Sequence, residues 1–152
     1  QGVSSAASDV YKRQTRAFLR ASTEAGEVLV VEAPGTGADG PRFAAALVLD
    51  AEGDPGYDQV RWQVDAAPDE VLVVHVLATL PQFHGRGYAR QLLEGAIAAA
   101  REAGAKALRL DTFTTNGRAQ GLYESCGFAN CGVYEDFYPH LGRAGVLYEF
   151  AL

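Results

Sequence analysis

Apolar residues occur along the chain in runs that clusters of glycine and proline separate, and the spacing within a run distinguishes strand from helix. Residues 27–33 and 43–50 are rich in Val, Leu and Ala, and each run predicts a strand. Residues 34–41 contain three glycines and two prolines, which interrupt strands and predict a hairpin connection. Residues 15–22 fit a short helix, and residues 59–64 fit either a short strand or a helix.

The run at residues 71–79 carries almost no polar residue, which is typical of a strand buried on both faces of a sheet. We therefore expect it to be the central strand, closed by Pro81. A helix follows from Ala89, and Gly104 supplies its C-terminal stop. The expected inner stripe of that helix is Leu92, Leu93, Ala96, Ile97 and Ala100.

A second strand and helix follow in the same order. Leu108 and Leu110 mark a short strand that ends at residues 111–112, and Asn116 is placed to cap a helix that Gly127 ends. The expected inner stripe of this helix is Ala119, Leu122, Tyr123 and Cys126.

Residues 128–134 and 146–152 predict two last strands on either side of a loop around Pro139. Strands that alternate with helices and end in a strand pair indicate an α/β (α+β) domain, with a mixed central sheet flanked by helices. A chain of 152 residues, 48% of them hydrophobic, is long enough for one such domain with its own core.

Charge and cysteine content narrow the class of partner. The formal charge of −6, without a basic run, argues against nucleic acid, and the longest apolar stretch is too short to span a membrane. Cys126 and Cys131 do not form a disulfide framework, which favours reduced thiols in a cytoplasmic protein. The sequence has no clustered ligands for a metal site, so we expect no metal.

The first residues differ in character from the rest. The sequence contains no Met, and residues 4–14, SSAASDVYKRQ, resemble the translation of a sequencing-library adapter. A natural disordered tail is the alternative, since small polar residues are common there. We interpret residues 1–14 as a foreign or disordered leader and residues 15–152 as the domain, and we hypothesise that the gene is truncated at its 5′ end.

The segment between the central strand and the first long helix carries the strongest chemical signal. Gly85 and Gly87 flank Arg86 at the start of the helix, where unpaired backbone N–H groups favour an anion. A glycine-rich turn at an ordinary helix start would look the same. A dinucleotide-binding loop is a third interpretation, because Asp111 ends the next strand, but Arg90 stands where that loop needs its third glycine.

Two motifs together resemble the GNAT superfamily of N-acetyltransferases. Gln82-x-x-Gly85-x-Gly87-Tyr88-Ala89 is similar to the acyl-CoA loop of that superfamily, and Asn116-x-x-Ala119-x-x-Leu122-Tyr123-x-x-x-Gly127-Phe128 is similar to its downstream helix motif. The resemblance runs from about residue 71 to the C-terminus. It implies a GNAT-like fold, here lacking the first strand and helix that usually precede the hairpin.

The resemblance also implies the site. Acetyl-CoA would be the co-substrate, its pyrophosphate held by the loop and its pantetheine arm in a gap where the strand at residues 71–79 splays from the strand ending at Thr112. Asn116 would meet the pantetheine amides, and Tyr123 the thioester sulfur. The implied cofactor-binding residues are Leu77, Ala78, Thr79, Gln82, Phe83, His84, Gly85, Arg86, Gly87, Tyr88, Ala89, Asn116, Ala119 and Tyr123.

Direct attack of an amine on a thioester needs a base for the ammonium and an acid for the leaving thiolate. Tyr123 is the candidate acid, although its place on an apolar stripe also fits plain core packing. His75 is the candidate base, because it lies two residues before Leu77 on what should be the same strand face. A hydrogen-bonded core histidine, or deprotonation through ordered water, are the alternatives.

The expected function is therefore N-acetyl transfer from acetyl-CoA to a primary amine of a small molecule or peptide, through a ternary complex. The rival is a non-catalytic acyl-CoA-binding regulatory domain. Asp111, Thr112 and Tyr134 could line the acceptor pocket, although Asp111 also fits an ordinary strand-end carboxylate. The sequence identifies no acceptor and leaves a monomer and a homodimer both open.

Overall fold

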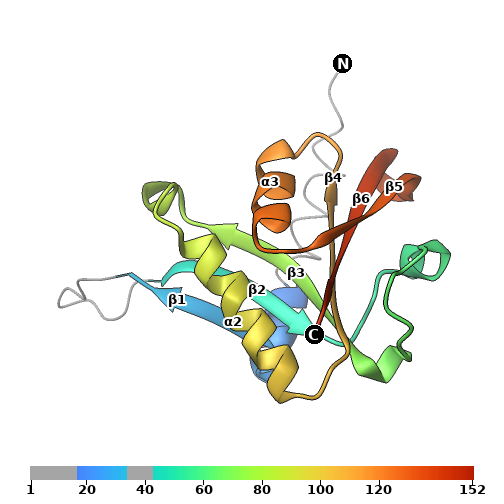
Figure 1. Ribbon diagram of the computed structural model, residues 1–152. Coiled ribbons are helices and arrows are strands. Elements are labelled where there is room, and N and C mark those ends of the chain that lie inside the picture. Colours follow the sequence, from blue (N-terminus) through green and yellow to red (C-terminus); the bar gives the residue numbers. More distant parts are fainter. Residues whose placement is uncertain (1–16, 34–42) are drawn as a thin grey trace.

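The computed structural model describes residues 17–33 and 43–152 (Figure 1), so the predicted leader at residues 1–14 and the connection at residues 34–41 lie outside the described residues. The strands are β1 (Val28–Glu32), β2 (Phe43–Asp50), β3 (Val71–Thr79), β4 (Ala107–Phe113), β5 (Ala129–Tyr138) and β6 (Arg143–Ala151). The α-helices are α2 (Tyr88–Glu102) and α3 (Gly117–Ser125), residues 17–25 are also α-helical, and short 3-10 helices lie in the connections.

The described strands form one mixed sheet in the order β1-β2-β3-β4-β6-β5. Neighbouring strands run antiparallel except β3 and β4, which run parallel, as expected for two strands joined by the helical crossover α2. In Figure 1, α2 crosses in front of β1, β2 and β3, while the helical residues 17–25 lie behind the sheet. The predicted mixed sheet flanked by helices is confirmed, and β3 is central.

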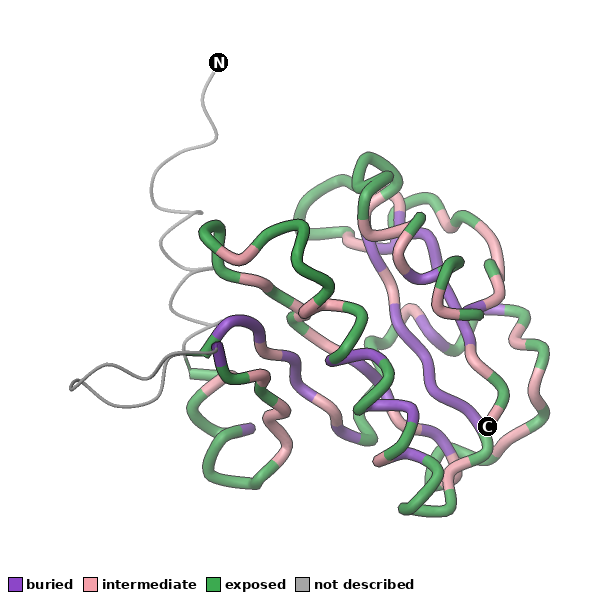
Figure 2. The backbone as a smooth tube through the Cα atoms, turned by 60° about the vertical axis from the view of Figure 1, so that its left-hand side comes forward, coloured by how far each residue is buried: buried purple, intermediate pink, exposed green. Residues whose placement is uncertain are grey.

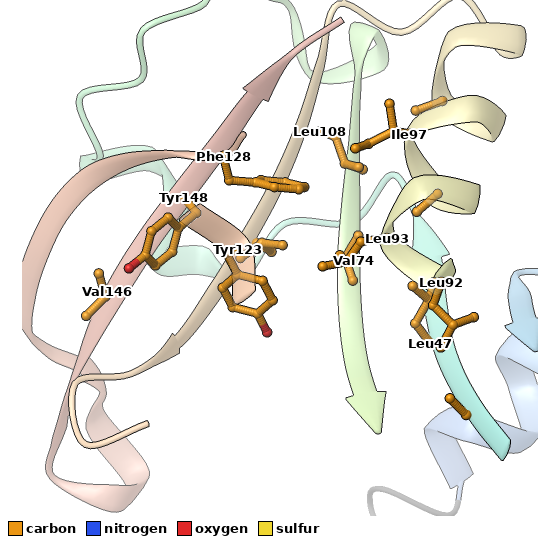
Figure 3. Close-up of a cluster of buried hydrophobic side chains, with 14 residues drawn as sticks. Leu47, Val74, Leu92, Leu93, Ile97, Leu108, Tyr123, Phe128, Val146 and Tyr148 are labelled. Atoms are coloured by element: carbon orange, nitrogen blue, oxygen red, sulfur yellow. The ribbon is translucent and has the colours of Figure 1, made fainter. Parts of the chain in front are cut away.

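One face of the sheet is covered by both long helices. The predicted stripe of α2 forms its buried side, and α2 ends where Gly104 adopts a left-handed φ of 76°. The predicted stripe of α3 packs into the same apolar cluster, with Tyr123 fully in it and Ala119, Leu122 and Cys126 at its margin. Figure 3 shows this cluster between α2, β3, β4 and β6, and Figure 2 shows the buried backbone concentrated in the sheet and the inner side of α2.

The opposite face is covered by the chain between β2 and β3 and by the end of β5. Tyr57, Val60 and Phe137 pack there against Val71, Val73, Ala107 and Leu147. Phe137 fits between two backbones: a Cβ at Gly56 would lie 2.6 Å from its ring, and one at Gly145 would lie 2.7 Å from it. Any side chain at either glycine would therefore displace Phe137 from the core.

A buried ion pair joins this covering segment to the sheet. Arg109 Nε donates to Glu149 Oε1 at 2.9 Å, between facing residues of β4 and β6. The other Glu149 oxygen accepts the backbone N–H groups of Gln63 at 2.7 Å and Val64 at 2.9 Å. The Arg109 guanidinium lies 4.2 Å above the ring of Trp62. These polar contacts fix residues 60–64 without a ladder, so the predicted strand or helix at 59–64 is wrong.

The last two strands are longer than the sequence predicts. β5 runs on to Tyr138 and β6 already begins at Arg143, because the ladder between them resumes after a bulge between Tyr134 and Tyr138. Asp136 has a φ of 55° in that bulge, and local sequence propensity does not predict this conformation. No helix in the described part of the chain has the length and apolarity needed to cross a membrane.

The Arg109–Glu149 pair gives a stability prediction. Glu149→Gln removes the charge from a side chain that is 1% exposed and leaves Arg109 buried without its counter-ion. We expect the free energy of unfolding to fall by about 3–5 kcal/mol, measured by guanidinium chloride titration. Glu70→Gln breaks the exposed Lys106–Glu70 pair instead and serves as the control, which should unfold at the wild-type denaturant concentration. Equal midpoints for the two variants would contradict the role given to Glu149.

Candidate functional site

The centre of the sheet is open on one side. β3 and β4 pair only through Val71–Ala107, Leu72–Leu108 and Val73–Arg109, although both strands continue beyond those residues. Beyond Val73 the β4-facing backbone groups of β3 have no partner in that ladder, whereas β4 stays paired with β6 as far as Phe113. The predicted splay is therefore confirmed. It leaves backbone donors and acceptors free at the middle of the molecule.

Two clefts meet at this opening, and both are lined by Leu77, Asn116 and Tyr123. The helix-side cleft, of about 430 Å³, extends between the first turns of the two long helices. Its other lining residues are Thr79, Phe83, His84, Gly85, Gly87, Tyr88, Ala89, Arg90, Arg118, Ala119 and Leu122. The strand-side cleft, of about 470 Å³, is otherwise lined by Phe18, Val74, Val76, Asp111, Thr112, Phe113 and Tyr138.

A bulge in β3 determines which side chains face the clefts. The pairing with β2 passes from Val48–His75 to Ala46–Ala78, so Val76 and Leu77 together oppose one residue of β2. Val76 adopts a φ of 52°, which is unusual for a β-branched residue. The extra residue reverses the alternation of side chains, and Leu77 packs on the α2 side with Leu72 and Val74.

The bulge also removes the reason for predicting that His75 is the base, which was a strand face shared with Leu77. Without the bulge His75 and Leu77 would share a face, but the structure places His75 outside both clefts. Its Nε2 lies 3.2 Å from Asp50 Oδ1 and 2.9 Å from the carbonyl of Glu52. Since both neighbours are acceptors, Nε2 carries the proton. The Phe18 ring stands edge-on to the imidazole, with ring centroids 5.8 Å apart.

The loop after β3 presents bare backbone at the start of α2. Gly85 and Gly87 have φ values of 75° and 81°, and a Cβ at either position would meet no atom within 4 Å. The first backbone bond of the helix runs from Gln91 N–H to the Gly87 carbonyl, so the N–H groups of residues 88–90 have no partner within the helix. These groups form a positive terminus that opens into the helix-side cleft.

Arginine and histidine side chains lie around this terminus. His84 Nε2 lies 2.9 Å from the Thr79 carbonyl, which ties the loop to the end of β3. Arg90 bonds the hydroxyl of Ser125 at 2.7 Å and so holds the two long helices together. Arg86 lies over the ring of Phe83, 5.7 Å from its centroid. Arg118, on the first turn of α3, also lines the cleft.

Asn116 joins the two clefts and caps α3, as predicted. Its Oδ1 accepts the N–H of Ala119 at 3.3 Å, and its Nδ2 donates to Thr112 Oγ1 at 3.1 Å. The cap fixes the side chain at the carboxyl end of β4, beyond the last rung that β4 shares with β3.

Tyr123 brings the apolar core into contact with the clefts. Its ring packs on Tyr148, with centroids 5.5 Å apart, and on Phe128. Burial, followed by the charge of Asp111, raises the pKa of Tyr123 to about 12, so the phenol keeps its proton at neutral pH. Figure 3 shows its hydroxyl directed away from the cluster and toward β3. Within the described residues that hydroxyl makes no hydrogen bond.

Asp111 lines the strand-side cleft and is held by two tyrosines, of which Tyr138 also lines the cleft. Tyr57 donates its hydroxyl proton to Asp111 Oδ1 at 2.7 Å, and Tyr138 donates to Oδ2. Burial and the charge of Asp111 raise the pKa of both phenols. Thr112 lines this cleft as expected, but Tyr134 does not, because its hydroxyl is bonded to Arg61 N–H at 3.0 Å.

The structure brings together most of the predicted cofactor-binding residues. Ala78, Gln82 and Arg86 are exposed and do not line the helix-side cleft. Sequence reasoning missed Arg118 and Leu122 in that cleft and Phe18, Phe113 and Tyr138 in the strand-side cleft. Helical spacing after Asn116 is the signal that could have found Arg118 and Leu122. Within the described residues no group of three or more His, Cys, Asp or Glu side chains could hold a metal ion.

Comparisons with known proteins show which family this chain resembles. Residues 15–128 match the model of the acetyltransferase (GNAT) family. The chain is 36% identical over 63 residues to the ribosomal protein bS18-alanine N-acetyltransferase of Haemophilus ducreyi, which covers 41% of this chain and 43% of that protein. It also matches an uncharacterized protein of Mycobacterium leprae, at 38% identity over 49% of this chain and 20% of that protein. The chain thus spans less than half the length of these curated relatives.

Solved structures show the same fold. A ribosomal-protein-alanine N-acetyltransferase from Brucella melitensis superposes with a TM-score of 0.65 at 18% identity, over 92% of this chain and 78% of that one. A Bacillus subtilis acetyltransferase in complex with CoA superposes with a TM-score of 0.57 at 19% identity, over 77% and 73% of the two chains.

The charge of Asp111 and its effect on nearby tyrosines lead to a prediction for their titration. Because the carboxylate disfavours a nearby phenolate, Asp111→Asn should lower the pKa of Tyr57, Tyr123 and Tyr138. The ring-carbon resonances of labelled tyrosine, followed by NMR up to pH 11, should begin to move at lower pH in the variant. Tyr148, whose pKa burial and Glu124 raise to about 12, is the internal control and should not change. An unchanged Tyr123 resonance would refute the coupling.

Proposed function

The chain belongs to the GNAT family of acetyltransferases, and on that premise we propose that it moves an acetyl group from acetyl-CoA to the primary amine of a small molecule or peptide. The observation that carries the proposal is the meeting of two clefts at Leu77, Asn116 and Tyr123, where the sheet is open. Two substrates that enter from different clefts can react there directly, in a ternary complex.

We propose that the helix-side cleft holds acetyl-CoA. The free N–H groups of residues 88–90 and the bare backbone at Gly85 and Gly87 suit a pyrophosphate, and Arg118 adds positive charge from the facing helix. The edge of β3 near Leu77, which does not pair with β4, suits the amides of the pantetheine arm, with Asn116 also lining the cleft. The two free thiols and this co-substrate agree with a cytoplasmic location.

The chemistry then needs few groups from the protein. The neutral amine forms a C–N bond with the thioester carbonyl, and free backbone N–H groups of β3 stabilise the oxyanion. As the C–S bond breaks, the departing sulfur takes the phenolic proton of Tyr123. Because the pKa of Tyr123 is about 12, the phenolate is short-lived. The nitrogen of the new amide releases a proton, and water carries a proton back to the phenolate.

His75 enters no step of this proposal. Its protonated Nε2 is engaged by Asp50 and Glu52, and the residue lies outside both clefts. We propose instead that the amine loses its proton to water in the strand-side cleft. A non-catalytic acyl-CoA-binding domain would need the helix-side cleft only, and would have no use for a second cleft that meets it at Tyr123.

The activity itself is tested with the full-length parent protein, acetyl-CoA and a panel of small amines and peptides. We expect release of free CoA thiol that depends on the amine, together with acetylated products seen by mass spectrometry. Binding of acetyl-CoA without thiol release from any amine would favour the regulatory domain instead.

Tyr123→Phe tests the acid. Because general acid catalysis contributes about 10²–10⁴-fold, we expect kcat to fall by about 100-fold or more while the affinity for acetyl-CoA stays within about twofold. Tyr148→Phe is the matched control, since that phenol packs on Tyr123 but lines neither cleft. Full kcat in folded Tyr123→Phe would show that the acid role is wrong.

Gly87→Ala tests the anion site. Both Gly87 and Gly104 have a positive φ and open space where a Cβ would lie, so alanine at either should cost about 1–2 kcal/mol of stability. Only Gly87 precedes the free N–H groups, and a backbone that shifts to relieve strain there would misalign them. We expect Gly87→Ala to raise the Kd for CoA about tenfold, by isothermal titration, and Gly104→Ala to leave it unchanged. Equal affinities would contradict the assignment.

A further inference from the structure

We propose that Asp111 makes the strand-side cleft selective for acceptors that present their amine as an ammonium on an apolar arm. The inference rests on the acetyl transfer proposed above, and adds the class of acceptor that the cleft would take. It follows from the charge of Asp111, the way in which its carboxylate is held and the side chains around it.

The charge of Asp111 is not neutralised by the described part of the protein. Among the described residues the ion pairs join Lys106 to Glu70 and Arg109 to Glu149, His75 lies beside Asp50, and none of these contacts includes Asp111. Arg109 lies two residues earlier on the same strand face, but its guanidinium is engaged by Glu149 and Trp62. A half-buried carboxylate without a cation favours binding one, since buried charges are normally paired.

The carboxylate of Asp111 is held in place, and its oxygens can accept further hydrogen bonds. Each oxygen accepts one tyrosine hydroxyl, from Tyr57 and Tyr138 respectively, and a carboxylate has about four lone-pair directions. The donors are neutral, so they orient Asp111 and leave its full charge. Both rings are fixed in turn: Tyr57 packs on Trp62 at 5.2 Å between centroids, and Tyr138 packs on Phe113 at 4.6 Å. An ammonium therefore meets a rigid acceptor with free lone pairs.

Most of the other residues that line this cleft are apolar or aromatic. Phe18, Phe113 and Tyr138 supply aromatic rings, while Val74 and Val76 suit an alkyl or aryl arm. A volume of about 470 Å³ accommodates a small amine. An alkyl amine is almost entirely ammonium at neutral pH, so the cleft must first collect that form. An acidic acceptor would be repelled by Asp111.

The location of Asp111 makes this contact relevant to the reaction. The same cleft is lined by Asn116 and Tyr123, which are shared with the helix-side cleft. An amine that enters along Asp111 is thus delivered to the opening in the sheet, where the two clefts meet.

The test uses two acceptors of the same shape. 2-Phenylethylamine is a cation at pH 7.5, whereas O-benzylhydroxylamine, with oxygen in place of one methylene, is neutral. In the full-length wild-type protein we expect a higher kcat/KM for the cation, carried by a lower KM. Asp111→Asn should reduce the ratio of the two kcat/KM values by about tenfold or more, the range expected for a charge-assisted hydrogen bond. An unchanged ratio overturns the proposal.

Asp54→Asn is the matched control. Its carboxylate is close enough to raise the pKa of Tyr57 and Tyr138, yet it does not line the cleft and accepts Gly56 N–H. This variant should keep the wild-type ratio. A loss equal to that of Asp111→Asn would mean that the general negative field, not contact with Asp111, selects the cation, and would overturn the assignment.

A second measurement needs no variant at Asp111. 2-(Dimethylamino)ethanol, protonated at pH 7.5, and 3-methylbutan-1-ol have the same shape and differ in charge, and neither carries an amine that can be acetylated. The protonated amine, which has one N–H to donate, should inhibit competitively against 2-phenylethylamine at a concentration about tenfold lower than the alcohol, the range given by one charge-assisted hydrogen bond. Equal inhibition overturns the proposal while leaving acetyl transfer intact.

The proposed acetyl transfer is tested separately by the two acceptors. If neither 2-phenylethylamine nor O-benzylhydroxylamine causes thiol release, acetyl transfer itself is contradicted, and so is the inference on Asp111.

Discussion

An opening at the centre of a β-sheet requires that the two strands stop sharing hydrogen bonds while each remains held from elsewhere. β3 and β4 pair over three rungs and then diverge, β3 being held by β2 and β4 by β6. The divergence would be costly if it buried the freed backbone groups, because unpaired buried amides are strongly unfavourable. Here those groups face two clefts, and they remain available to water or to a substrate.

The two sides of the opening are supported by different kinds of interaction. On the helix side, the apolar stripes of α2 and α3 place two helix starts next to each other, and Asn116 fixes the second one. On the strand side, support comes from polar contacts and close packing: Glu149 anchors residues 63 and 64, and Phe137 lies between two glycines. These contacts set Tyr57 and Tyr138 against Asp111.

Periodic features of the fold could be predicted from the sequence. The bounds of β2 and β3 and the stripe of α2 follow from burial patterns that are regular over many residues. The loop at Gly85 and Gly87 followed from residue types that tolerate a positive φ. His75 could not be placed, because the bulge at Val76 sets a β-branched residue in a conformation that its propensity opposes. Tyr138 was missed for the same reason, since the bulge at Asp136 carries it onto Asp111.

The two clefts differ in how freely their walls can change. The walls of the helix-side cleft are the first turns of α2 and α3 and the edge of β3, which also build the main core. Phe18, Phe113 and Tyr138 in the strand-side cleft come from a peripheral helix and from strand ends. Substitutions there can alter what enters without disturbing the core. The helix-side cleft is therefore constrained by folding, whereas the strand-side cleft is open to divergence among descendants of a common ancestor.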